Sequence, residues 1–398
     1  MKKVLTVLVV CMLAIGSCFF FWKNPDVTGK ISNTIIAIYE SLTNGEVATY
    51  TNSTKINKLQ PKQATHYYNT LTQQQQIIYA SFANSVKNLN PKVTLNGYNS
   101  EPNSNVEDID KAVAAFFADH PEVFYVNNKY AVSTSQSFIG QKVELNISYL
   151  VKDKEELNSK IEKIDEKVKE LVAKSSGKTG VEAEIILHDQ LANLSVYYDY
   201  ENIEDLPIET HNIYGAFINQ KAVCDGFAKG MQILLDRVNI ESIIVLGTLD
   251  SDAHAWNLVK LDDVWYNLDL TSDKSIKNAN LEDNVVIHSY FNITTKQIEQ
   301  THVFDNKEII PEAIATDKSY YKATGKYIKS TDDFSSTLQR ILDDNKSEDI
   351  AEFIAENINN VPDKTAKVLQ NKNNNIYSSG NKFVYYKILD SYILVKNK

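Results

Sequence analysis

A chain of 398 residues exceeds the size of one ordinary hydrophobic core, so its length predicts two or three domains. The formal net charge is −10, and only two of the 41 basic residues are arginine, so the chain lacks the basic surface typical of nucleic-acid binding and we expect no such partner. Three cysteines, two of them in one apolar run, cannot build a disulfide framework.

The first 22 residues predict an export signal or a membrane anchor. Lys2 and Lys3 precede an uncharged run, residues 4–22, close to the roughly 20 apolar residues that a spanning helix needs. The positive-inside tendency then places the body of the protein outside the bacterial cytoplasm. We expect an uncleaved anchor. The alternative is a lipid anchor, because the run that ends at Cys18 is similar to the lipobox of bacterial lipoproteins.

Residues 23–62 are mostly polar and predict a tether. Residues 63–178 predict an N-terminal α+β domain. Its expected elements are two amphipathic helices, a short strand, an alternating strand and a charged helix with one apolar stripe, over Thr65–Leu89, Val106–Ala118, Val123–Val126, Phe138–Val151 and Lys152–Lys174.

The run Ser175–Gly180 predicts a hinge, after which we place a second domain over residues 179–325 and a small α+β module over residues 326–398. The second domain should contain helices over Val181–Val196 and Ala222–Arg237, a strand over Ser242–Gly247, a hairpin, and a short strand or core edge at His288–Phe291. The module should contain two helical stretches within Thr331–Asn357 and an alternating region over Ile376–Val395.

Cys224 is the only cysteine outside the N-terminal apolar run, and it lies in the first turn of a predicted helix. The free N–H groups and the positive dipole end of a helix start stabilise a thiolate. Gly226 removes a side chain beside Cys224 and would let a substrate backbone approach. A buried cysteine acting as a small hydrophobic residue is the alternative interpretation.

The hairpin places a histidine and an aspartate together. His254 opens one strand, Asp269 follows the next, and the acidic turn Asp262–Asp263 joins the strands. In a hairpin with a loop of two or four residues, the numbers of two directly opposed residues add up to an odd number. The numbers 254 and 269 also add up to an odd number. His254 and Asp269 should therefore point to one face, directly opposed or diagonal. A histidine oriented by a carboxylate can take a proton from a thiol and return it to a leaving group.

Together the three segments resemble the transglutaminase-like superfamily, within the papain-like cysteine enzymes. C-D-G-F-A at Cys224, H-A-W-N-L-V at His254 and W-Y-N-L-D at Asp269 are similar to its motifs, over about residues 185–273. The resemblance implies an α+β core with a catalytic helix packed on an antiparallel sheet, a Cys224–His254–Asp269 triad and no cofactor. Members often carry D-P-T-W-D where this chain has D-L-T-S-D, which changes the floor of the cleft.

We therefore expect a thiol enzyme that attacks an amide through an acyl-thioester on Cys224. Water as acceptor makes it a protease or deamidase, and an amine makes it a transglutaminase; cell-wall peptides or surface proteins fit the expected location. The Cys224 N–H should stabilise the oxyanion with a second donor, Tyr214 or Gln220, and Trp256 is a further cleft candidate.

Two other interpretations stay open. The protein could be a non-catalytic surface module that binds wall polymer or protein and keeps the fold as a scaffold. A zinc site from Cys224, His254 and Asp269 is conceivable, but separations of 30 and 15 residues match no recognised ligand spacing, so we expect no metal at this site.

Overall fold

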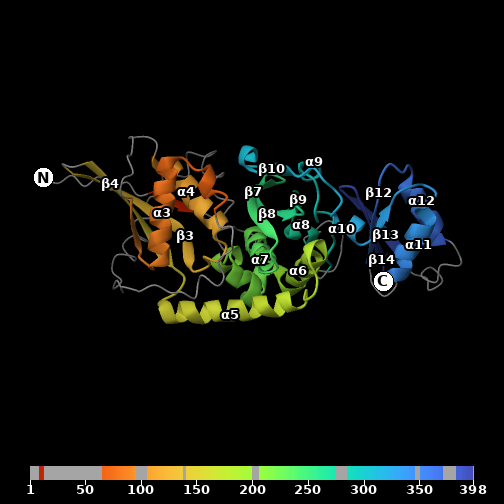
Figure 1. The fold of residues 1–398 in the computed structure, drawn as a ribbon, viewed down its shortest axis with the longest axis horizontal. Coiled ribbons are helices and arrows are strands. Elements are labelled where there is room, and N and C mark those ends of the chain that lie inside the picture. Colours follow the sequence, from red (N-terminus) through yellow and green to blue (C-terminus); the bar gives the residue numbers. More distant parts are fainter. Residues whose placement is uncertain are drawn as a thin grey trace.

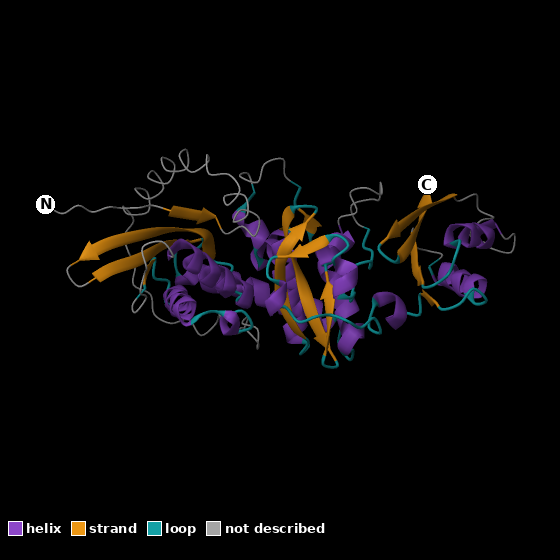
Figure 2. Cartoon of the chain, turned by 90° about the horizontal axis from the view of Figure 1, so that it is seen from above, coloured by secondary structure: helices purple, strands orange, loops and turns teal. Residues whose placement is uncertain are grey.

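The computed structural model describes residues 9–12, 65–95, 105–137, 140–199, 206–274, 285–345, 350–370 and 382–397. Three α+β units follow one another along the long axis in sequence order (Figure 1), and the view from above shows the same row (Figure 2). The expected tether and most of the expected anchor, including Cys18, lie outside these residues. The part of the anchor that is described is β1 (Val9–Met12), which pairs with β3 (Val126–Ser137). Among the described helices, none is long and apolar enough to cross a membrane.

The N-terminal unit is a four-stranded antiparallel sheet, in the order β1-β3-β4-β2, with two helices beside it. Its remaining elements are η3 (Tyr68–Thr70), α3 (Gln73–Lys87), β2 (Lys92–Thr94), α4 (Asn105–Asp119) and β4 (Gly140–Tyr149). The helix predicted from Thr65 begins later because Thr72 and Gln75 form a reciprocal capping box. The strand prediction over Val123–Val126 was wrong in extent: only Val126 belongs to β3.

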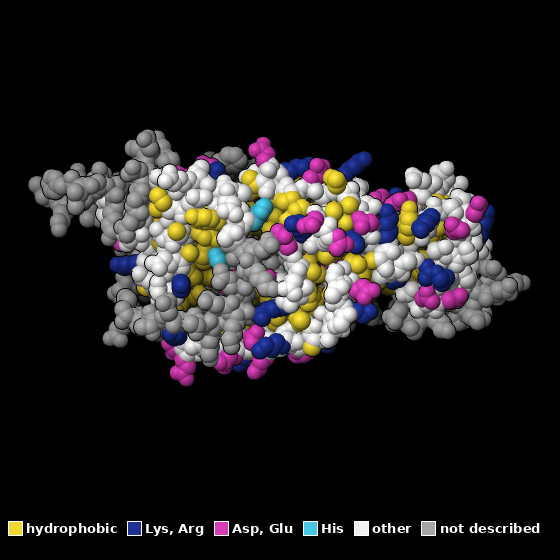
Figure 3. All heavy atoms as spheres, in the orientation of Figure 1, with side chains coloured by type: hydrophobic (Ala, Val, Ile, Leu, Met, Phe, Trp, Pro, Cys, Tyr) yellow, Lys and Arg dark blue, Asp and Glu magenta, His cyan; other side chains and the backbone are white. Residues whose placement is uncertain are grey.

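The long helix α5 (Lys154–Ala173) runs beneath the N-terminal and central units (Figure 1). Its side-chain cap is Asp153, which accepts from the Glu156 N–H. The apolar stripe is buried against α6 (Gly180–Leu194), η6 (Gly215–Asn219) and α7 (Cys224–Arg237) of the central unit. Charged side chains line the lower edge of the molecule, where this helix runs (Figure 3).

The central unit is an antiparallel sheet in the order β10-β7-β8-β9, and α7 packs on β7 and β8. Its strands are β7 (Glu241–Leu249), β8 (Asp252–Leu261), β9 (Val264–Leu268) and β10 (His302–Phe304), and the short parallel pair β5 (Val196–Tyr197) and β6 (Lys221–Ala222) lies before α7. Asp262 and Asp263 form the two-residue hairpin turn with φ of 49° and 63°, the left-handed values that type I′ turns require. The short 3-10 helix η5 (Ile208–His211) leads toward the start of α7.

The C-terminal unit is a sheet in the order β11-β12-β14-β13 with two helices packed together. Its elements are β11 (Tyr327–Ile328), α11 (Phe334–Asp344), β12 (Ile350–Ala355), α12 (Val361–Gln370), β13 (Lys382–Ile388) and β14 (Ser391–Asn397). The prediction of two helices within Thr331–Asn357 was wrong, because the second stretch is strand β12. The alternating region does form a hairpin. The strand alternative for His288–Phe291 was also wrong: this segment is a turn at the edge of the core.

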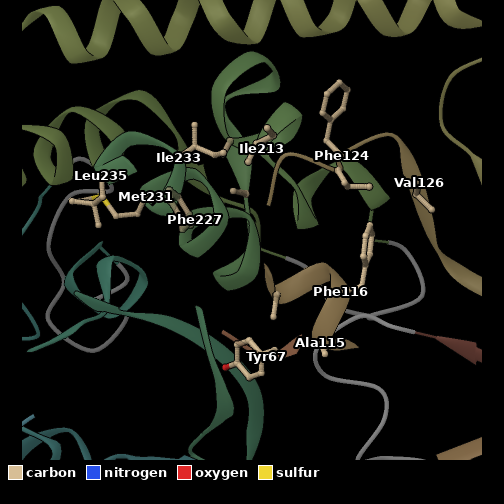
Figure 4. Close-up of a cluster of buried hydrophobic side chains, with 14 of the residues drawn as sticks. Tyr67, Ala115, Phe116, Phe124, Val126, Ile213, Phe227, Met231, Ile233 and Leu235 are labelled. Carbon is tan, nitrogen blue, oxygen red and sulfur yellow. The ribbon is translucent and has the colours of Figure 1, made fainter. Parts of the chain in front are cut away.

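One hydrophobic core extends from the N-terminal unit into the central unit. Phe116 and Phe124 belong to the same cluster as Phe227 and Met231 of α7 (Figure 4). Tyr67 adds a polar link, because its buried hydroxyl donates to the Ile244 carbonyl of β7 at 2.5 Å. The two units therefore share buried surface, and we expect them to unfold together.

Replacing Tyr67 with phenylalanine should lower the free energy of unfolding of this joint core by about 1–2 kcal/mol, because a buried carbonyl loses its donor. Urea denaturation followed by intrinsic fluorescence measures it. Tyr68→Phe makes the same chemical change at the neighbouring half-buried ring and should cost less. Equal losses in the two variants would contradict the role given to the Tyr67 hydroxyl.

Candidate active site

Cys224 is the first residue of α7 and is partly exposed. No side chain caps this helix, because the residue at the cap position is Val223. The N–H groups of the first turn are therefore not taken by a capping side chain. A partly exposed thiol at an uncapped helix start meets the local requirements for a nucleophile beside an anion-stabilising helix end.

His254 and Asp269 meet as the parity of the hairpin predicts. The pairing Asn257↔Leu268 extends to place Asp269 opposite Trp256, and so diagonal to His254. His254 Nε2 lies 2.9 Å from Asp269 Oδ2, and both side chains are buried. With Nε2 bonded to the carboxylate, Nδ1 is the ring nitrogen left for the hydrogen bond with Cys224.

Burial alone lowers the pKa of His254, but the charge and hydrogen bond of Asp269, with a smaller contribution from Cys224, raise that pKa to about 10. Burial raises the pKa of Asp269, whereas His254 and His302 outweigh this effect and hold it well below its usual range. The pair therefore favours an imidazolium beside a carboxylate, which is the protonation state that a thiolate partner requires.

Asp269 directly precedes the short helix α8 (Leu270–Lys274). Its Oδ1 accepts from the backbone N–H groups of Thr271 at 3.0 Å and Ser272 at 3.2 Å, and the Ser272 hydroxyl donates to Oδ2. The D-L-T-S-D run thus supplies three donors to the carboxylate. Burying a carboxylate is tolerated when its oxygens are satisfied in this way.

His302 is a site residue that the sequence did not reveal. It lies buried on β10, and its Nε2 is 3.0 Å from Asp269 Oδ2, the same oxygen that His254 uses. The Thr301 hydroxyl lies 2.8 Å from His302 Nδ1. Only the long-range pairing of β10 with β7, His302 opposite Leu249, brings it here. Nothing in the local T-H-V-F sequence indicated that position.

The remaining candidates have varied surroundings. Trp256 is 1% exposed, stacks on His254 at 6.2 Å and donates to Asn267 Oδ1, so it supports the imidazole from within the core. Tyr214 stacks on Phe124, and Gln220 is exposed with a left-handed φ of 56°. The role of Tyr214 or Gln220 as second oxyanion donor stays a prediction.

The prediction that Gly226 leaves room for a substrate backbone was wrong. A Cβ on Gly226 would lie 2.3 Å from the Thr210 carbonyl oxygen, so the space beside this glycine is filled by the chain itself. The glycine instead lets η5 pass close to α7.

A small apolar hollow lies between the N-terminal and central units. Side chains of α4, of the 123–128 segment and of β7 line it, together with His211 and Lys229. Lys229 follows Cys224 by five residues, and Ala228 packs against the lining residue Ile244. The hollow therefore flanks α7 about one turn beyond the thiol.

No family model and no curated protein matches the sequence. Among solved structures, one described as a TGase is similar over 38% of this chain and 45% of that chain, with 16% identity and a TM-score of 0.27. A candidate cysteine protease from Cytophaga hutchinsonii is similar over 37% of this chain and 63% of its own, with 13% identity and a TM-score of 0.23. The chain thus spans less than two thirds of each. Because both TM-scores are low, the case for the site rests on the geometry above.

Gly226→Ala should destabilise the protein by about 1–3 kcal/mol, because the new methyl group overlaps a backbone carbonyl. Gly230→Ala is the matched control on the same helix: its nearest neighbour is the end of the Leu191 side chain at 3.2 Å, and alanine favours a helix by about 1 kcal/mol. Urea unfolding compares the two. Equal changes in the two variants would show that the Thr210 carbonyl does not restrict residue 226.

The His254→Gln variant tests the His254–Asp269 ion pair through the pH dependence of stability. Since folding raises the pKa of His254 from 6.5 to about 10, the pair contributes fully below about pH 6.5 and is lost as the pH rises toward 10. The difference in thermal midpoint between the protein and the variant should therefore be largest near pH 6 and shrink toward pH 10.

The control for this series is His66→Gln. Burial lowers the pKa of His66, so its contribution to stability falls as the pH drops and the trend should run in the opposite direction. A His254 difference that stays constant over the whole range would contradict the ion pair.

Proposed function

We propose that the protein is a cysteine-dependent acyltransferase or amide hydrolase of the transglutaminase-like type. The observation that carries the proposal is the buried Asp269–His254 hydrogen bond, whose imidazole also hydrogen-bonds the thiol of Cys224 at the start of α7. These are the nucleophile, the base and the orienting group that acyl transfer to a thiol requires.

The chemistry follows from this arrangement. The Cys224 sulfur attacks an amide carbonyl, and the developing oxyanion is stabilised by N–H groups at the start of α7. The imidazolium of His254 gives its proton to the departing amine, which leaves an acyl-thioester on Cys224. His254 then takes a proton from water or from an acceptor amine, and that nucleophile releases the acyl group. Asp269 stays ionised throughout and holds the ring in position.

The hollow beside α7 would accept an apolar side chain of a peptide substrate. Its lining is mostly apolar, and Asn128, which also lines it, has a buried side-chain oxygen with no hydrogen-bond partner among the described residues. A substrate backbone N–H would satisfy that oxygen. Protein or cell-wall peptides at the outer face of the membrane are proposed as substrates because of Lys2, Lys3 and the apolar run after them.

The decisive measurement incubates the protein with a glutaminyl peptide and a fluorescent primary amine, followed by mass spectrometry. Amine incorporation indicates a transglutaminase, conversion of glutamine to glutamate a deamidase, and shortened peptides a protease. Cys224→Ser and His254→Gln should each lower the rate by at least about 1,000-fold, since the residues of such a unit act together.

Cysteine alkylation serves as the control that does not need the right substrate. Iodoacetamide should modify Cys224 at near-neutral pH in the protein, and considerably more slowly in His254→Gln. A Cys224 that reacts only at the pH of an ordinary thiol, equally in both proteins, would overturn the enzyme proposal and favour a non-catalytic surface module.

A further inference from the structure

A second histidine cluster lies between the central and C-terminal units. His188 of α6 and His288 are both buried, and each directs one ring nitrogen at the same carboxylate oxygen. His188 Nδ1 and His288 Nε2 each lie 3.0 Å from Asp189 Oδ1. These three ligand atoms all lie within 4.8 Å of one another, which is the spacing that a single metal ion can span.

The outer nitrogens of the two imidazoles face buried carboxylates. His288 Nδ1 is hydrogen-bonded to Glu352 Oε1 of the C-terminal unit at 2.6 Å, whereas His188 Nε2 lies 3.3 Å from Asp273 Oδ2, and neither of these last two buried atoms has a hydrogen-bond partner among the described residues. A carboxylate at the outer nitrogen takes the ring proton there and leaves a lone pair on the inner nitrogen. Metal-binding histidines are nearly always held in this way.

The catalytic cluster lacks this feature. His254, Asp269 and His302 also have ligand atoms within 4.8 Å of one another. Their outer nitrogens, however, face the Cys224 thiol and the Thr301 hydroxyl, and neither is a carboxylate. The two clusters therefore differ in the groups that prepare a histidine for metal, and the comparison favours the cluster around Asp189.

The charges of the cluster point the same way. The three carboxylates of Asp189, Asp273 and Glu352 outnumber the two imidazoles, so a cation placed between them meets an excess of negative charge at a buried interface.

We propose that His188 Nδ1, Asp189 Oδ1 and His288 Nε2 form a binding site for a zinc-type divalent cation, with water as fourth ligand. The Asp189 side chain is 36% exposed and provides the route for the ion and the water. Two nitrogens and one carboxylate oxygen are the ligand set that zinc, cobalt and nickel prefer over calcium or magnesium. Tyr320, stacked at 3.5 Å on His288, fixes that ring. The site is independent of the proposed acyl-transfer chemistry.

The site would join the central and C-terminal units, because the carboxylates that face its histidines come from both units. Glu352 lies on β12 of the C-terminal unit and binds His288 through both the ring and the backbone N–H, at 2.6 and 3.1 Å. A bound cation therefore stabilises the contact between β12 and the central unit, and the expected role is structural.

The experiment titrates Zn²⁺ and Co²⁺ into the purified full-length chain after dialysis against chelator. One ion per chain should bind, the thermal midpoint should rise, and Co²⁺ should give the intense visible absorption of a four-coordinate site. His288→Gln and Asp189→Asn should each weaken binding by at least about 100-fold, and Glu352→Gln by about 10- to 100-fold. Because the Asp189 side chain is partly exposed, Asp189→Asn tests the site if the His288→Gln variant fails to fold.

The matched control is His302→Gln, which changes a histidine of the catalytic cluster and should retain the ion. Loss of the ion in His302→Gln but not in Asp189→Asn would place the metal at the catalytic cluster and overturn the proposal. So would the absence of binding at micromolar Zn²⁺ in the unmodified chain. Neither result depends on enzyme activity, so failure of this proposal and failure of the proposed function are separable.

Discussion

The buried carboxylate of Asp269 is the constraint on which the centre of the molecule depends. A carboxylate that is 1% exposed is tolerated only when its oxygens are satisfied, and here the donors come from three separate elements. Strand β8 provides His254, strand β10 provides His302, and α8 provides its own first-turn N–H groups. The order of the strands and the position of α8 are thus tied to a single side chain.

This constraint explains which parts of the site could be predicted from sequence. Cys224, His254 and Asp269 follow from local patterns, a helix start and a two-residue hairpin, whose geometry depends on residues close in the chain. His302 does not, because it reaches Asp269 through a pairing of strands about 50 residues apart, between β7 and β10. Glu352 approaches His288 from a different unit, and no local pattern carries that information.

The same distinction applies to the fold. Strongly periodic segments such as α5 and α7 were predicted nearly to their ends, since one apolar stripe determines the buried face. Strand β3 was largely missed because its polar end, Ser133–Ser137, has no apolar alternation and is held by pairing with β4. Strand β12 was taken for helix because a short apolar run fits either period, and β14 decides between them.

Helix α8 connects the two histidine clusters. The residue before it, Asp269, orients His254. Its fourth residue, Asp273, lies 3.3 Å from His188 Nε2 and accepts from the Tyr290 N–H. The Asp273 N–H donates to the Asp269 carbonyl, so one turn of helix fixes the separation of the two carboxylates. The turn combines the backbone N–H groups of Thr271 and Ser272 with the Ser272 hydroxyl, so the residue at position 272 helps to hold the Asp269 carboxylate in place.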